Sequence, residues 1–476
     1  MRDVSIKTRG KVPHRVKGHH RQHFRRDLTA PTLTLLTIGG IMGSGLFMAS
    51  GITIHQAGPG VWLLYVLGFI AMSLEINALA EMSIATPTPG SFLVFTRQVL
   101  GPAWTFVAGW IFWFSSVLTM SSEVTAAALF SRYWFPQMPL WGWSLFYSAL
   151  IIGVNFISVR GFGTVENIMA GIKTVAVLGF LVVAGLTLGH WLPPARPLPS
   201  PDFALGLRPG LFPHGFFGAA PTMVLVLFAY AGTGVIGMAA AEAKDPQRTL
   251  PQAIRSTIWL VGIMYLGSIL ALLAMVPWTA ESDRISPFVL ALEHTSLPYV
   301  SSLMNLILLF AVLSTMNAAL YSNVRVLYTL AHEGQAPKSL GRLNRRGLPS
   351  RATWTSAGLL ALTIALAYVL PHKAYAYLVT ATGFQAMFIW LMILLTELYY
   401  RPYLERHHPE RLTHKLIGYP YTTYGVMGLV VLALILSLTS ANQLVGAAAG
   451  FLGIAIATAI WFIVRRRIPR DENSPS

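Results

Sequence analysis

The chain has 476 residues, of which 54% are hydrophobic and only 11% are charged. Soluble globular chains carry about 25% charged residues, so this composition indicates an integral membrane protein rather than a soluble one. The chain contains no cysteine, which excludes disulfide bonds, thiol catalysis and zinc–thiolate sites.

The first 27 residues are polar and contain nine Lys or Arg and four His residues. We expect residues 1–28 to form a basic, disordered cytoplasmic tail that lies close to anionic lipid. A nucleic-acid or metal-binding role for its histidines is the less favoured interpretation.

A glycine-rich stretch interrupts the first long apolar run, which extends over residues 33–54. It reads GGIMGSGLF from residue 39 to residue 47. Glycine lowers helix stability, and a broken helix at membrane depth is tolerated only where it lines a cavity or is buried in protein. The freed N–H groups of such a break favour an anion such as a carboxylate. The alternative is close helix packing through the Gly-x-x-x-Gly pair Gly39 and Gly43.

Hydropathy predicts about twelve membrane spans of roughly 20 residues or more. They lie at 33–54, 60–84, 101–130, 139–158, 166–189, 215–240, 254–277, 299–330, 352–370, 375–399, 420–440 and 443–464. We assign residues 29–465 to one transmembrane domain and residues 466–476 to a C-terminal cytoplasmic tail.

The basic residues indicate how these spans are oriented. If the N-terminus is cytoplasmic, 28 of the 34 Lys and Arg residues fall in cytoplasmic segments, five fall outside, and Lys173 lies within a span. This bias follows the positive-inside rule and predicts a multi-pass protein of the cell membrane with both termini in the cytoplasm. It also accounts for the net charge of +16 without a nucleic-acid partner.

A second glycine cluster lies in the sixth predicted span, where residues 228–237 read FAYAGTGVIG. Two breaks five spans apart are expected of an inverted repeat of five spans, the architecture of many secondary transporters. Unwound carbonyls at this break can accept hydrogen bonds from a substrate ammonium group. Together the breaks favour transport of a zwitterion such as an α-amino acid over simple close packing.

Several charged or aromatic residues lie inside the spans, where charge is costly. Lys173 is either a proton-coupling site in place of a bound cation or a donor to carbonyls freed by the first break. Glu123 could line the substrate site or carry a proton, and the alternative is a protonated carboxyl that bonds to a neighbouring helix. Phe228 is either a lid on the substrate or a packing residue. Glu75 lies deep in the second span, and we assign it no role.

Two further acidic residues, Glu242 and Glu397, lie near predicted cytoplasmic helix ends. We expect Glu242 to pair with Lys244 and Glu397 to pair with Arg401.

The chain resembles the amino acid permeases of the amino acid–polyamine–organocation superfamily, most closely their amino acid transporter family, over about residues 28–465. Each motif is weak alone, but the set is specific because the motifs occur in order and at matching spacing. They lie at 39–59, 80–92, 158–173, 232–251 and 333–349.

The resemblance implies an all-α membrane protein with a five-plus-five inverted repeat (LeuT-like), broken helices 1 and 6, and two extra C-terminal helices. It also implies secondary active import of amino acids, usually driven by protons. By this resemblance the carboxylate-binding positions are Ile41, Ser44 and Gly45, and we assign the neighbouring Gly43 to the substrate site as well. The wall of the sixth helix and its amino-group acceptors are Phe228, Ala229 and Ala231. Glu123 falls where a residue lines the pocket, and Lys173 falls at a vacated sodium position.

The sequence departs from the family pattern at several positions. The family usually has Glu where Gly234 stands, Arg where Asn77 stands, and Ser-His where Thr396 and Glu397 stand. The first departure removes a carboxylate tied to coupling or substrate recognition, which either changes the proton mechanism or shifts its work to Glu123 and Lys173.

These observations predict a proton symporter that imports amino acids by alternating access. The expected partners are an amino acid, protons and the lipid bilayer, with no nucleic acid. The alternatives are an exchanger of two amino acids or of an amino acid and its amine, and a non-transporting sensor. We expect no enzyme, cofactor or metal site because no catalytic constellation is visible.

Overall fold

The computed structural model describes residues 28–88, 90–157, 162–204, 206–208, 210–281, 284–344, 349–369 and 373–465. Within these residues the chain is helical, and its β-structure is limited to two isolated bridges. The predicted tails, apart from Leu28, and the motif residues 158–161 lie outside the described part of the chain.

The helices follow one another in the order of the predicted spans. Their bounds are α1 Ala30–Ile41, α2 Ser44–Phe47, α3 Ala49–Ala57, α4 Val61–Ala85, α5 Phe92–Leu100, α6 Pro102–Arg132, α7 Leu140–Ile157, α8 Phe162–Leu188, α9 Pro201–Ala204, α10 Phe216–Ala219, α11 Met223–Ala229, α12 Gly234–Ala239, α13 Pro246–Met275, α14 Pro287–Glu293, α15 Val300–His332, α16 Ser350–Val369, α17 Ala374–His407, α18 Tyr421–Ser437 and α19 Ala441–Val464. Short 3-10 helices complete the chain.

Every predicted span falls on helical structure. Within the described residues, eight helical segments are long and apolar enough to cross a membrane, and three shorter apolar helices accompany them. The all-α membrane fold is therefore confirmed, whereas the count of twelve spans stays a prediction. Between the second and third predicted spans, the structure has the amphipathic helix α5, which was not predicted from the sequence.

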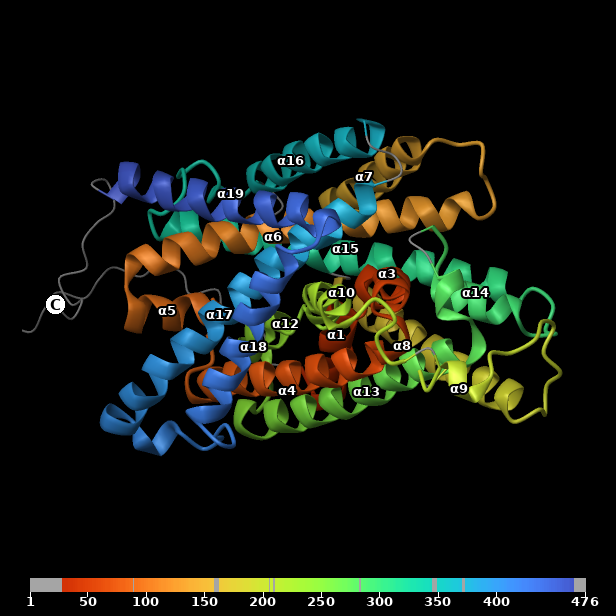
Figure 1. Ribbon diagram of the computed structural model, residues 1–476. Helices are drawn as coiled ribbons and strands as arrows, with labels where there is room; N and C mark the ends of the chain where they lie inside the picture. Colours follow the sequence, from red (N-terminus) through yellow and green to blue (C-terminus); the bar gives the residue numbers. More distant parts are fainter. Residues whose placement is uncertain are drawn as a thin grey trace, which may run out of the picture.

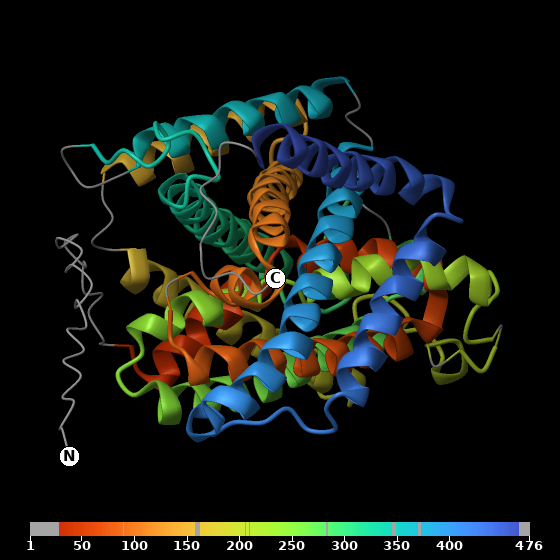
Figure 2. The ribbon, with the colours of Figure 1, turned by 90° about the vertical axis from the view of Figure 1, so that its left-hand side faces the viewer.

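The long helices form a bundle that surrounds the two broken segments (Figure 1). α6 packs along α15 and α17, while α1 packs between α8 and α13. α5 and the end of α19 lie at one end of the bundle, and α9 and α14 lie at the other. Figure 2 looks along the bundle from the first of these ends and shows α16 and α19 at its edge.

The outer surface of the bundle is apolar. Val175 and Val182 of α8, Ile435 of α18 and Ile463 of α19 are all more than half exposed. Extended apolar surfaces of this kind contact lipid in a membrane protein and would be a liability in water. The chain is accordingly a multi-pass membrane protein.

Glycines bring the two breaks into direct backbone contact. α1 ends at Ile41 and α2 begins at Ser44, while α11 ends at Ala229 and α12 begins at Gly234. Gly232 has a φ of +106°, a conformation that side chains disfavour, and a Cβ there would overlap the carbonyl of Gly40. The glycines therefore have both of the roles considered from the sequence. They break the helices, and they also let the two broken helices approach closely.

Candidate functional site

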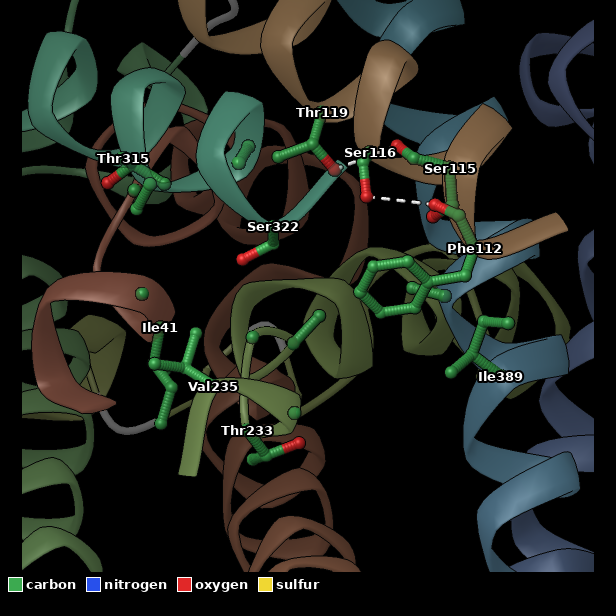
Figure 3. Close-up of a pocket in the computed structure, with 18 of the residues that line it drawn as sticks. Ile41, Phe112, Ser115, Ser116, Thr119, Thr233, Val235, Thr315, Ser322 and Ile389 are labelled. Carbon is green, nitrogen blue, oxygen red and sulfur yellow. Dashed lines mark hydrogen bonds between the residues drawn. The ribbon is translucent and has the colours of Figure 1, made fainter. Parts of the chain in front are cut away.

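A cavity of about 140 Å³ lies beside the two breaks. α6, α15 and α17 complete its walls. Figure 3 shows hydroxyl side chains of α6 and α15, among them Ser116, Thr119 and Ser322, on the opposite side of this space from Ile41 and Val235 of the breaks. The cavity thus combines an apolar lining with a few hydroxyl and carboxyl groups, as small-molecule sites commonly do.

The structure brings the predicted site residues together. Among the predicted site residues, those that line the cavity are Ile41, Gly43, Gly45, Glu123, Phe228 and Ala231. The remaining three, Ser44, Ala229 and Lys173, are buried and contact residues of its wall.

The N–H group expected to bind a substrate carboxylate is bonded to a carboxylate of the protein itself. Both carboxylate oxygens of Glu123 lie 3.0 Å from the backbone nitrogen of Ser44, and the Ser44 hydroxyl donates to Oε1 at 3.0 Å. A Cβ at Gly43 would overlap Glu123 Oε1, so glycine is required for this approach. At the first break, the freed Ser44 N–H group is therefore occupied by the carboxyl group of Glu123.

Lys173 bonds to groups freed by the first break. Its Nζ donates to the carbonyl of Gly39 at 3.0 Å and to Thr315 Oγ1 at 2.9 Å. Thr315 Oγ1 in turn lies 3.0 Å from the carbonyl of Met42. The hydrogen bonds expected under the structural interpretation are present, and the coupling interpretation is compatible with the same geometry.

Glu166 is a member of this buried cluster that sequence reasoning missed. It accepts a hydrogen bond of 2.7 Å from Ser314, and its charge interacts with that of Lys173, as does the charge of Glu123. A Cβ at Gly39 would lie 2.9 Å from Glu166 Oε1. The available signal was spacing, since Glu166 and Lys173 are seven residues apart and share one face of a helix.

Two tyrosines also went unnoticed in the sequence. The hydroxyl of Tyr265 lies 2.8 Å from the carbonyl of Ala229 and 3.2 Å from that of Ile41, which ties the two breaks together. Tyr375 donates to the carbonyl of Ser44 at 2.9 Å. The Ala229 carbonyl, expected to accept a substrate ammonium, is thus already paired with Tyr265.

A second cavity, of about 370 Å³, lies on the other side of α2. Tyr375, Ser286 and Arg132 are among the residues that line it. Because Tyr375 bonds to Ser44 and Ser286 donates to the Phe47 carbonyl at 2.7 Å, α2 and its partners separate the two cavities. The central cavity instead extends towards α5, where Phe92 lines it.

Both expected ion pairs near the helix ends are corrected by the structure. Glu242 lies 3.4 Å from Arg325, on α15, rather than pairing with Lys244. Arg401 pairs with Glu81 at 3.4 Å, while Glu397 accepts a hydrogen bond of 3.0 Å from Thr423. The partners of these charged side chains thus come from helices that are distant in the sequence, which proximity along the chain could not indicate.

Comparison with known proteins gives a consistent result. The amino acid permease family model matches residues 32–471. The uncharacterized amino acid permease YtnA of Bacillus subtilis is 32% identical over 93% of this chain and 95% of its own. The lysine-specific permease LysP of Escherichia coli is 32% identical over 92% and 93% of the two chains. A gamma-aminobutyric acid permease of Bacillus subtilis is 33% identical over 84% and 85%.

A solved structure shares the fold. A mutant of the Eremococcus coleocola manganese transporter superposes with a TM-score of 0.56, covering 95% of this chain and 97% of that one. The sequence identity is 13%, so this likeness concerns the arrangement of helices only.

Proposed function

This chain belongs to the amino acid permease family, and on that premise we propose that it imports amino acids across the cell membrane by proton symport with alternating access. Both termini would lie in the cytoplasm. The observation that supports the proposal most is the cavity at two contacting helix breaks, one of which holds a carboxylate on its freed N–H group. Broken helices that meet at a substrate site are typical of secondary transporters.

Glu123 suggests how a substrate would be bound. An amino acid in the cavity presents a carboxylate and an ammonium group, and its carboxylate competes with Glu123 for the Ser44 N–H group. Once displaced, Glu123 is a carboxylate that lines the cavity and can pair with a cationic group of the substrate. This arrangement favours amino acids that carry an additional amino or other cationic group.

We expect Glu123→Gln to change selectivity. A charge-assisted hydrogen bond contributes about 1.5–3 kcal/mol, so its loss should weaken binding of lysine at least about 10-fold relative to alanine. Substrate-induced thermal stabilisation of purified protein, measured over a panel of amino acids, provides the affinities. Thr119→Val is the matched control, since it changes a cavity side chain without changing charge. An equal effect of Glu123→Gln on lysine and alanine would contradict this role.

The two cavities suggest the state that the structure represents. The central cavity extends towards α5, on the predicted cytoplasmic side, while α2, Tyr375 and Ser286 close it from the other end. We therefore interpret this structure as inward-facing, and we propose that α2 and its partners separate when the transporter opens outwards.

Tyr375→Phe should shift this equilibrium towards the outward-facing state. It removes a hydrogen bond worth about 0.5–1.5 kcal/mol, or roughly 2- to 10-fold in population. Because the chain lacks cysteine, Ser322→Cys introduces a single thiol in the central cavity. The thiol should react faster with a membrane-impermeant reagent added outside when Tyr375→Phe is also present. Identical rates with and without Tyr375→Phe would argue against this closure.

An amino acid exchanger is the second candidate, because the same two cavities serve either cycle. Uptake into proteoliposomes with and without a preloaded amino acid separates the two functions. A symporter does not need the preloaded substrate, whereas an exchanger does.

A further inference from the structure

Glu75 of α4 is a buried carboxyl that the site described so far does not use. Its side chain is inaccessible to solvent, and neither of its oxygens makes a hydrogen bond of normal geometry. Among the described residues, only Glu75 and Glu281 have both carboxylate oxygens buried without a hydrogen-bond partner. Glu281 lies in a connection between helices. An ionised carboxylate without a partner is costly at membrane depth, so such a residue calls for an explanation.

Glu75 lies behind the second break. α4 packs against α12, and the hydroxyl of Thr233 lies near the Glu75 carboxyl without forming a hydrogen bond of normal geometry with it. Thr233 is itself a lining residue of the central cavity, and Figure 3 shows it away from the hydroxyl groups of α6 and α15. A single side chain therefore links Glu75 to the space that would hold substrate and water.

The residue at position 234 bears on the role of Glu75. The resemblance noted above places a glutamate where this chain has Gly234, immediately after Thr233. Gly234 also lines the cavity, and a Cβ built on it meets no atom within 4 Å. The chain thus lacks a carboxyl on the cavity side of the second break and has an unpartnered one on the α4 side.

Charged groups elsewhere do not compensate for Glu75. The α-helices that pack against α4 are α3, α5, α11, α12, α13, α17 and α18. Their charged side chains are Arg97 of α5, Arg248 and Arg255 of α13, and Glu397, Arg401, Glu405 and Arg406 of α17. Within the described residues, none of these forms a hydrogen bond with Glu75. Glu81, two turns further along α4, pairs with Arg401, and the cluster of Lys173, Glu123 and Glu166 lies at the first break. Hydration from the cavity is therefore the influence best placed to change the charge of Glu75.

We propose that Glu75 is a proton-carrying residue of the transport cycle and supplies to the second break the carboxyl that position 234 lacks. This inference rests on the proton symport proposed above. A carboxylate oxygen of Glu75 takes a proton from cavity water when the break faces one side, and the resulting O–H bond breaks to return the proton to water on the other side. Movement of Thr233 relative to α4 controls access between the two.

The first test is Glu75→Gln in proteoliposomes. The variant should bind substrate and exchange it at equal pH with rates within about 3-fold of wild type, since it removes no hydrogen bond. Accumulation driven by an inward proton gradient should fall to equilibrium, and the pH dependence of uptake should flatten. Glu75→Asp, which keeps an acid, should retain gradient-driven accumulation and provides a second variant if Glu75→Gln folds poorly.

The second test is rescue from the other side of the break. Adding Gly234→Glu to Glu75→Gln should restore gradient-driven accumulation, whereas adding Gly234→Gln, which has the same size but no acid, should not. Rescue by both would overturn the assignment, as would gradient-driven accumulation by Glu75→Gln alone. If wild type transports but ignores the gradient, the symport proposal and the role of Glu75 both fail. If wild type responds and Glu75→Gln responds equally, only the role of Glu75 fails.

Discussion

Gly45→Val is expected to abolish binding of every substrate. A Cβ at Gly45 would lie 2.7 Å from the Cα of Ala229, closer than side-chain carbons approach a backbone atom in folded proteins. Neither backbone can yield without separating the two breaks, which together shape the cavity. We expect affinity to fall at least about 100-fold, equivalent to about 2.7 kcal/mol, for all amino acids alike.

The control for this variant is Gly428→Val. Gly428 is an exposed residue of α18, and a Cβ there meets no atom within 4 Å. This substitution should leave binding and the thermal midpoint nearly unchanged. Normal affinity in the Gly45→Val protein would refute the proposal that contact between the two breaks builds the substrate site.

Lys173→Ala is expected to eliminate proton-driven accumulation while some substrate binding remains. The substitution removes the donor to the Gly39 carbonyl and the cation that interacts with Glu166 and Glu123. Removing one partner from a buried charge cluster costs about 3–5 kcal/mol, so the thermal midpoint should also fall. The ratio of internal to external substrate should approach unity with the proton gradient applied.

A double variant separates coupling from stability. Lys173→Met combined with Glu166→Gln removes the cation together with one of the carboxylates that would be left without it. We expect this protein to regain much of the lost thermal stability and still fail to accumulate substrate. Unchanged accumulation by Lys173→Ala across a range of pH would show that the lysine is purely structural.

The fold was largely predictable from the sequence because its signals are local. Apolar runs of about 20 residues and clustered glycines determine where helices can cross the membrane and where they break. The helix α5 was not predicted because it is short and amphipathic. Hydropathy averaged over a membrane-span window does not detect such a helix.

The composition of the candidate site was predictable only in part. Glu123 and Lys173 could be selected because charge within a span is unusual, whereas the bond from Ser44 to Glu123 joins residues 79 apart in the sequence. In the sequence, Tyr265 and Tyr375 are indistinguishable from the many other aromatic residues of the spans. Their hydroxyl groups matter only because of the backbone carbonyls to which they donate. Such partners depend on how distant helices pack, as the pairing of Glu242 with Arg325 also shows.

The most direct test of the account is uptake of labelled amino acids into proteoliposomes that contain only this protein. We predict that amino acids with a cationic group accumulate above equilibrium when the external medium is more acidic than the interior, and only equilibrate when the gradient is absent. Accumulation that needs a preloaded amino acid and ignores the proton gradient would contradict proton symport and establish exchange instead.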